Sequence, residues 1–181
     1  MTQRFPTGDT DRRSRRLTVM WCAVTVIVLL VVWLLWGEGG YMIAWAASLA
    51  GAILLLHIMS IPRYTLVSDT ALEIHCVVEI TRIAYADLRS IRRVGPDALH
   101  DKYVLLGGYG FFGYYGYYFD TRRWETVKLY CRERRNLVEI TDITDQRYIV
   151  SCPEPDELIR TVRQAMHRRQ EQLQTPDENN G

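Results

Sequence analysis

Two long apolar segments, separated by only four residues, occupy most of the first third of the chain. The first extends from Leu17 to Trp36 and the second from Tyr41 to Ile61, and neither contains Asp, Glu, Lys or Arg. At a rise of about 1.5 Å per residue, a helix over either segment is about 30 Å long, which matches the hydrocarbon core of a bilayer. The pattern therefore predicts two transmembrane helices, at 17–36 and 41–61, joined in a tight hairpin.

Small residues recur at every fourth position of the second apolar segment. Ala44, Ser48 and Ala52 have this spacing, and so do Ala47 and Gly51. Small side chains at this spacing let helices approach closely in lipid. We expect the Val- and Leu-rich first segment, or a second copy of the chain, to fill the groove that they leave.

Polar and apolar positions alternate after residue 61, as they do in half-buried strands. Seven short strands are expected, at about 63–66, 72–78, 82–85, 88–94, 127–132, 138–141 and 147–150. The spacing then becomes helical, because Pro155 suits a first helical position and apolar residues from Leu158 to Met166 share one face. The pattern predicts an α+β fold, in which a seven-stranded antiparallel β-barrel or sandwich at 62–170 is capped by a C-terminal α-helix.

Charge is distributed unevenly along the 181 residues, although the net charge is only +1. Segment 1–16 carries five arginines, whereas the linker between the apolar segments carries only Glu38. Since Lys and Arg flank the cytoplasmic ends of membrane helices, we expect a cytoplasmic (inner) membrane protein with both termini in the cytoplasm. Segments 1–16 and 171–181 are expected to be disordered. A signal peptide is the competing interpretation, but the first apolar segment is longer than the usual signal and a second one follows it.

Residues 107–119 read GGYGFFGYYGYYF, a mixture of glycines and aromatic residues. They contain the pattern G-x-G-x-x-G, but no helix signal follows, so a nucleotide-binding loop is not predicted. In a structural interpretation, the glycines let the backbone bend while the rings cover the core or an adjoining strand. In a functional interpretation, the segment is an exposed aromatic surface that lies on the bilayer, on the hairpin or on a second subunit. The candidate contact residues are Phe111, Phe112, Tyr114 and Tyr115.

Two arginine clusters form the other candidate interaction surface. They are Arg89, Arg92 and Arg93 on one predicted strand, and Arg132, Arg134 and Arg135 at a strand end and turn. Each cluster is either a solvated face with acidic residues nearby or a surface for anionic lipid headgroups. No nucleic-acid recognition motif accompanies the arginines, so a nucleic-acid partner is not expected.

The sequence contains no recognisable catalytic, cofactor-binding or metal-binding motif. His75, His100 and His167 are far apart, and none belongs to a metalloprotease pattern. The four cysteines lack the spacing of metal ligands, and we interpret the three after residue 61 as small buried hydrophobes in a reducing compartment. No catalytic residue, cofactor or metal ligand is therefore predicted.

Four segments together resemble the bacterial pleckstrin-homology (PH)-like domains. They are PRYTL at 62–66, IAYADLRSI at 83–91, the glycine–aromatic segment, and PEPDELI at 153–159. The resemblance covers about residues 63–169. It implies a seven-stranded, strongly bent antiparallel barrel with a C-terminal helix, commonly attached to membrane helices and without established enzymatic activity as a class. Eukaryotic relatives bind phosphoinositides through basic residues between the first two strands, but the loop here, Ser68-Asp69-Thr70, lacks the Arg or Lys donors that phosphate binding needs.

These features favour a non-enzymatic integral membrane protein that presents a PH-like domain at the cytoplasmic face of the membrane. Its expected partners, besides the membrane, are a second copy, another protein or anionic lipid headgroups. Two alternatives stay open: several hairpins form a channel or transport component, or the domain is an enzyme that acts on lipid or nucleotide.

Overall fold

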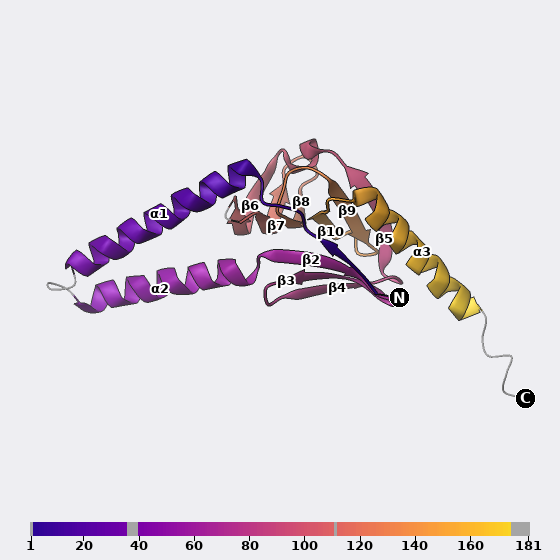
Figure 1. Cartoon of the computed structure of the whole chain (residues 1–181), viewed down its shortest axis with the longest axis horizontal. Helices are drawn as coiled ribbons and strands as arrows, with labels where there is room; N and C mark the ends of the chain where they lie inside the picture. Colours follow the sequence, from indigo (N-terminus) through magenta and orange to yellow (C-terminus); the bar gives the residue numbers. More distant parts are fainter. Residues whose placement is uncertain (1, 36–39, 111, 175–181) are drawn as a thin grey trace, which may run out of the picture.

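Two helices project from one side of a β-rich domain, and a third helix lies on its opposite side (Figure 1). The structure is a computed structural model that describes residues 2–35, 40–110 and 112–174. The helices are α1 (Arg12–Leu35), α2 (Gly40–Met59), a short 3-10 helix η1 (Pro96–Leu99) and α3 (Pro155–Gln174). The strands are β1 (Gln3–Pro6), β2 (Pro62–Val67), β3 (Ala71–Cys76), β4 (Ile80–Ala84), β5 (Leu88–Val94), β6 (Lys102–Tyr109), β7 (Tyr114–Asp120), β8 (Glu125–Cys131), β9 (Leu137–Asp142) and β10 (Arg147–Ser151).

The described strands form two sheets, with the order β1-β2-β3-β4 in the smaller and β5-β9-β10-β8-β7-β6 in the larger. Neighbouring strands are antiparallel except β8 and β10, which pair in parallel. The α+β class and the C-terminal helix are therefore confirmed. Of the predicted seven-stranded antiparallel β-barrel or sandwich, the barrel is wrong, because the two sheets are not closed into one. The strand number is also wrong, because three strands were missed: β1, β6 and β7.

The helical pair α1–α2 is inserted between two strands that pair with each other. β1 runs antiparallel to β2, with Phe5 opposite Thr65, so the chain leaves the small sheet, passes through both helices and returns to the neighbouring strand. Phe5 is 3% exposed, and the Thr7 hydroxyl donates a hydrogen bond of 3.0 Å to the Arg63 carbonyl. The prediction of a disordered segment 1–16 is thus wrong for β1 and for the first turn of α1.

The main core lies between the small sheet, the large sheet and α3. It contains, among others, Phe5, Val67, Leu72, Ile74, Ile83, Ile91, Val138, Ile140, Val150, Leu158 and Val162. A second core, which includes Tyr114, Tyr118, Leu129 and Ile149, has Leu99 of η1 as a member. The apolar face of α3 is buried as its spacing predicts. α3 continues to Gln174, so 171–174 are helical rather than disordered, and 175–181 lie outside the described residues.

One helix in the described part of the chain is long and apolar enough to cross a membrane. This window is Ser14–Val31 of α1, and only 11% of it is buried, which is unlike the core helix of a soluble protein. α2 contributes a shorter apolar stretch, Ala44–Ile53. A single such helix near the N-terminus is weak evidence for membrane insertion, because a signal sequence meets the same criteria of length and composition.

Candidate functional site

The glycine–aromatic segment forms the β6–β7 hairpin, and the tip of this hairpin rests on the first turns of α1. The Ser14 hydroxyl donates a hydrogen bond of 2.8 Å to the Gly110 carbonyl, and the Phe112 amide donates one of 2.9 Å to the Thr18 hydroxyl. Gly110 has a φ of 79°, and a Cβ there would collide with the Leu17 side chain. Glycine is therefore required at this contact for both backbone conformation and space.

The aromatic residues of this hairpin divide between the interior and the surface. Tyr114 and Tyr115 are 2% and 0% exposed, which supports the structural interpretation for these two. Phe112 is 38% exposed beside α1, and Phe111 lies outside the described residues. In the functional interpretation the segment lies on the bilayer, on the helical hairpin or on a second subunit, and its described contacts are with the helical hairpin.

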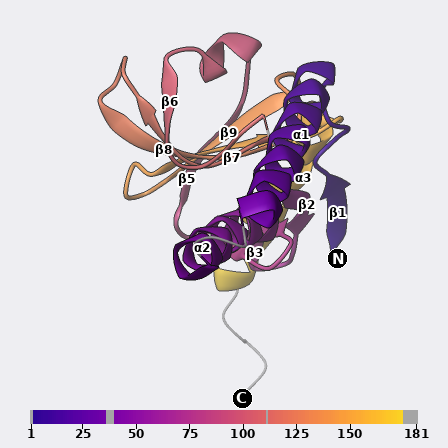
Figure 2. The same cartoon turned by 90° about the vertical axis from the view of Figure 1, so that its left-hand side faces the viewer.

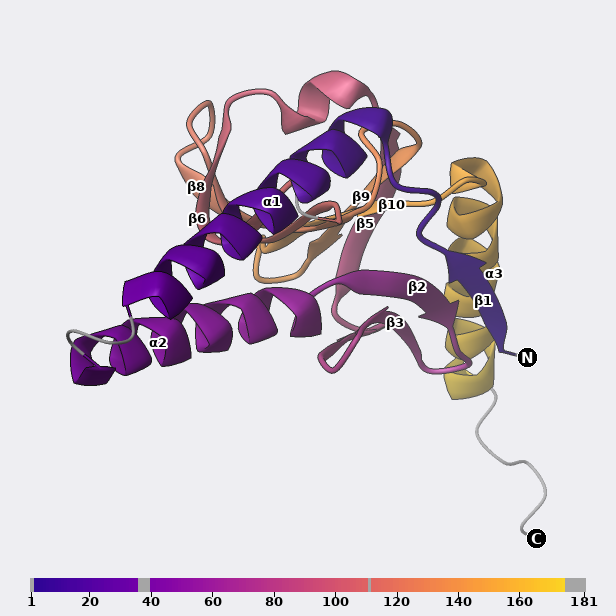
Figure 3. The ribbon, with the colours of Figure 1, turned by 60° about the vertical axis from the view of Figure 1, so that its left-hand side comes forward.

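β6 carries exposed apolar side chains, and the strand lies at the end of the domain from which the two helices project (Figures 1 and 3). It is an edge strand of the large sheet, and its exposed residues include Tyr103 (65%), Leu105 (58%) and Leu106 (72%). A long apolar edge strand in water is a site for pairing with another chain. At a membrane interface, by contrast, such side chains have a favourable apolar environment.

The first arginine cluster is neutralised by acidic partners. On β5, Arg89 pairs with Asp145, Arg92 with Glu139 at 2.6 Å, and Arg93 with Asp156 at 2.7 Å. Asp156 belongs to α3, on the side of the domain away from α1 (Figure 1). These pairs support the interpretation of a solvated face with acids nearby.

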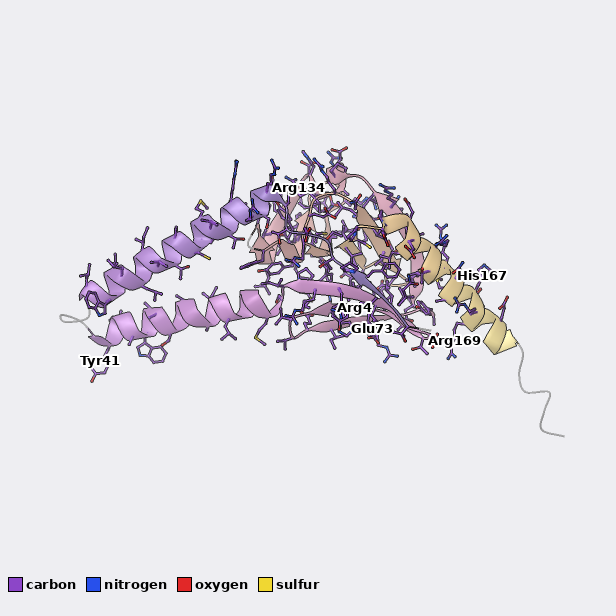
Figure 4. The ribbon with its side chains drawn as sticks, viewed as in Figure 1. Arg4, Tyr41, Glu73, Arg134, His167 and Arg169 are labelled. Atoms are coloured by element: carbon purple, nitrogen blue, oxygen red, sulfur yellow. The ribbon has the colours of Figure 1, made fainter. Side chains whose placement is uncertain are left out.

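The second arginine cluster lies where α1 leaves the domain. Arg132 donates a hydrogen bond of 3.0 Å to the Thr10 hydroxyl, and the guanidinium carbon of Arg134 is 5.6 Å from the centre of the Tyr114 ring. Figure 4 shows Arg134 beside the start of α1. The structure therefore separates the two clusters, and only the second adjoins the arginines that precede the apolar part of α1.

A cavity of about 600 Å³ separates α1, α2 and β6. Figure 2, which looks along the helices toward the domain, shows both helices in front of it, with the large sheet to one side and β1 to the other. The two helices are close at their remote ends and diverge toward the domain (Figures 1 and 3). The expected filling of the small-residue groove is not observed at Gly51, where an added Cβ would meet no described atom within 4 Å.

Comparison with protein families identifies the β-rich domain. A family model described as Bacterial PH domain matches residues 63–166, which is more than half of the chain. The chain belongs to the bacterial PH domain family. Comparison with curated proteins and with solved structures gave no match. The matched range begins inside β2, so β1 is a strand that this chain adds to the PH domain from the other side of the helical insertion.

Four charged residues that the sequence did not single out form a buried network across the large sheet of the PH domain: Lys102, Asp120, Arg147 and Glu139. Lys102 pairs with Asp120 at 2.5 Å, and Arg147 pairs with Asp120 at 3.0 Å and with Glu139 at 2.6 Å. Glu139 also forms an ion pair with Arg92, so the network extends from β6 to β5. Four of these side chains are less than a tenth exposed; Arg92 is the exposed end. Strand alternation offers no signal for such a network, since it assigns Glu139 to a polar face.

The network fixes the charge state of its carboxylates. Burial alone would raise the pKa of Asp120, but hydrogen bonds from Lys102 and Arg147 outweigh it and lower the pKa to about 2. Burial would also raise the pKa of Glu139, but hydrogen bonds from Arg147 and Arg92 outweigh this effect and lower the pKa. The network holds β5, β9, β10, β7 and β6 together through full charges, which is a structural role.

Metal-binding and nucleophilic groups do not converge on a site within the described residues. No group of three or more His, Cys, Asp or Glu there could hold a metal ion. His75 stacks on Tyr64 and lies 3.1 Å from Glu73. Burial raises the pKa of the Cys76 and Cys131 thiols to about 12, which makes them unreactive at neutral pH.

Proposed function

We propose that this chain is an integral membrane protein of two spans whose helical hairpin holds the PH domain against the cytoplasmic face of the membrane. There the domain serves as a non-enzymatic module that binds a protein partner, a second copy or anionic lipid headgroups. The observation that carries this proposal is the insertion of α1 and α2 between the paired strands β1 and β2.

Both ends of the hairpin are attached to the domain, which supports a role in fixing the orientation of that domain. The start of α1 is held by β1 before it and by the β6–β7 tip beside it. The end of α2 is held by backbone hydrogen bonds from Val77 to Ile61 (3.0 Å) and from Val78 to Met59 (3.2 Å). A tether alone would need only one flexible linker, so this double attachment favours a domain presented in one orientation.

Side-chain exposure and charge support the membrane orientation. Large apolar side chains of α1, including Val26 (62%), Leu30 (54%) and Trp33 (74%), are exposed in the described chain. Such a contiguous apolar surface is unfavourable in water and favourable in lipid. Arginines at the domain end of α1, together with the cluster at the β8–β9 turn, favour the cytoplasmic side for the domain.

The distribution of perturbed ionisable groups supports a non-enzymatic role. Among the described residues, Asp120 and Glu139 belong to the structural network, and the buried thiols belong to the two cores or adjoin them. The described lining of the cavity beside α1, α2 and β6 contains no acid, histidine or cysteine. General acid–base or nucleophilic catalysis needs such a group at the site where substrate binds.

Thiol labelling from each side of the membrane tests the topology. The Cys22→Ala background removes the exposed native thiol, and Tyr41→Cys or His100→Cys then adds one. Tyr41 lies at the end of the hairpin remote from the domain (Figure 4), whereas His100 lies on the domain after η1. We expect a membrane-impermeant maleimide to label Tyr41→Cys in spheroplasts and His100→Cys only in inverted vesicles. Labelling of both from the same side, or release of the chain from membranes by alkaline carbonate, would contradict the proposal.

A further inference from the structure

The cavity between α1, α2 and β6 is lined almost entirely by apolar groups. Its walls include Trp21 and Val28 of α1, Ala47, Ala50 and Gly51 of α2, and Gly108 of β6. The one hydroxyl that α1 contributes, that of Thr25, donates to the Trp21 carbonyl at 2.9 Å and is thereby satisfied. Water gains little in an apolar space of this kind, and in a bilayer the competing occupant is lipid.

The dimensions of the cavity match one leaflet of a bilayer. Its lining on α1 extends from Trp21 to Leu29, which is about 12 Å along the helix axis. The hydrocarbon of one leaflet is about 15 Å thick, half of about 30 Å. An acyl chain about 4 Å across, by van der Waals contact distances, occupies about 150 Å³ over about 12 Å, so the cavity has room for the two chains of one phospholipid. A helix about 10 Å wide would fit there for little more than one turn, so a second copy of α1 or α2 is a poor match.

Groups at the domain end of the cavity suit a phospholipid headgroup region. Arg15 and Arg16 are exposed and precede Trp21 on α1 by about 8 Å along the helix axis. They lie on a different face of α1 from the residues that line the cavity, so their long side chains would reach a phosphate at the membrane surface rather than enter the cavity.

We propose that one phospholipid of the cytoplasmic leaflet occupies this cavity, with its acyl chains between α1 and α2 and its phosphate near Arg15 and Arg16. This inference rests on the proposed membrane insertion. The small residues of α2 then have a purpose other than helix–helix contact: they leave room for acyl chains beside the PH domain.

The inference is tested by the amount of phospholipid that stays bound to the full-length chain. The chain is purified in a mild detergent, and the phospholipid in an extract of it is quantified by mass spectrometry. Gly51→Leu places four carbon atoms in the cavity, and Ala52→Leu is the matched control because Ala52 is not part of the described lining. We expect the wild type and Ala52→Leu to retain phospholipid, and Gly51→Leu to retain at least about fivefold less, because the added side chain takes the space of the acyl chains. Ala50→Leu serves as a second filling variant, and equal melting temperatures establish that the variants are folded.

Three results would overturn the inference. They are a wild type free of phospholipid, equal retention by all variants, and selective loss of cross-linked dimers in Gly51→Leu, which would identify a second copy as the occupant. Alkaline carbonate extraction of the same membranes separates the two proposals. A chain that resists extraction but retains no lipid contradicts only this inference, whereas a chain that is extracted contradicts the proposed function.

Discussion

Arg147 is the central cation of the buried network, and its replacement by methionine tests how much this network stabilises the PH domain. The Arg147 side chain is 7% exposed and joins two carboxylates, Asp120 and Glu139, that are 5% and 4% exposed. Removal of one partner from a buried ion pair costs about 3–5 kcal/mol, because a charge stays buried without its counter-ion. Lys102 and Arg92 still contact the two carboxylates, so we expect the lower end, about 3 kcal/mol.

The effect of Arg147→Met should depend on pH in a defined direction. The pKa of Asp120 is about 2 in the folded chain and 3.8 in the unfolded chain, so its ionisation contributes about 2 kcal/mol of stability. A lowered folded-state pKa means that this contribution is complete above pH 3.8 and is lost as the pH falls through about 2. Arg147→Met raises the pKa of Asp120, so the difference in stability between wild type and variant should narrow between about pH 4 and pH 2.

Thermal unfolding of the full-length chain in detergent, followed by circular dichroism at each pH, measures this effect. A loss of about 3 kcal/mol lowers the melting temperature by about 12 °C for a domain of this size. Arg89→Ala is the control, because its pair with Asp145 is exposed on both sides and contributes at most about 1 kcal/mol. A melting temperature of Arg147→Met no lower than that of the control would refute the reasoning. So would strict additivity of Arg147→Met and Glu139→Gln, since groups of one network should couple.

Two further predictions concern the N-terminal strand and the cysteines. Phe5→Ala should destabilise the domain by about 3–5 kcal/mol, because a ring that is 3% exposed leaves the main core. Gln3→Ala, on the same strand but exposed, should melt within a few degrees of the wild type, and equal melting of both variants would show that β1 adds nothing. Maleimide should leave Cys76, Cys131 and Cys152 unlabelled in the native chain, and rapid native labelling of any of the three would contradict the burial that raises the pKa values of these thiols.

The strands that the sequence predicts are those with one face in a core. β3 alternates Leu72 and Ile74 with Glu73 and His75, and only the apolar pair is fully buried. α3 is predicted for the same reason, since its apolar residues share one helical face. β1 escapes prediction because Phe5 is its only buried residue and because its partner β2 is reached only after the chain has passed through both helices.

The sequence does not predict the β6–β7 hairpin, because its glycines and the burial of β7 on both faces remove the usual alternation of polar and apolar residues. Tyr114 and Tyr115 are consecutive, so they point to opposite sides of the strand. Tyr114 enters the second core, while Tyr115 covers Gly108 on the facing strand, and both are buried as a result. A run of aromatic residues without polar alternation therefore does not show in the sequence which rings are interior. In the structure, Tyr114, Tyr115 and Tyr118 are buried, whereas Tyr109, Phe112 and Tyr117 are exposed.

The candidate arginines were identified by sequence, but their roles depend on partners distant in the chain. Arg92 is paired with Glu139, which lies 47 residues later and on an adjacent strand. Sequence proximity groups Arg92 with Arg89 and Arg93, whereas the fold assigns a different acid to each. Pairing across a sheet is set by strand order, and strand order follows from the whole fold rather than from local pattern.

The attachment of the two helices to different sheets gives the cavity a defined width. The start of α1 is bonded to the tip of β6–β7 in the large sheet, whereas α2 continues through two residues into β2 of the small sheet (Figure 3). Between these sheets lies the main core, and a close-packed core has one preferred spacing. The distance between α1 and α2 at the domain end is therefore set by residues such as Leu72 and Ile140 rather than by contacts between the helices. This coupling predicts a preformed cavity, and it explains why small residues on α2 do not bring the two helices together.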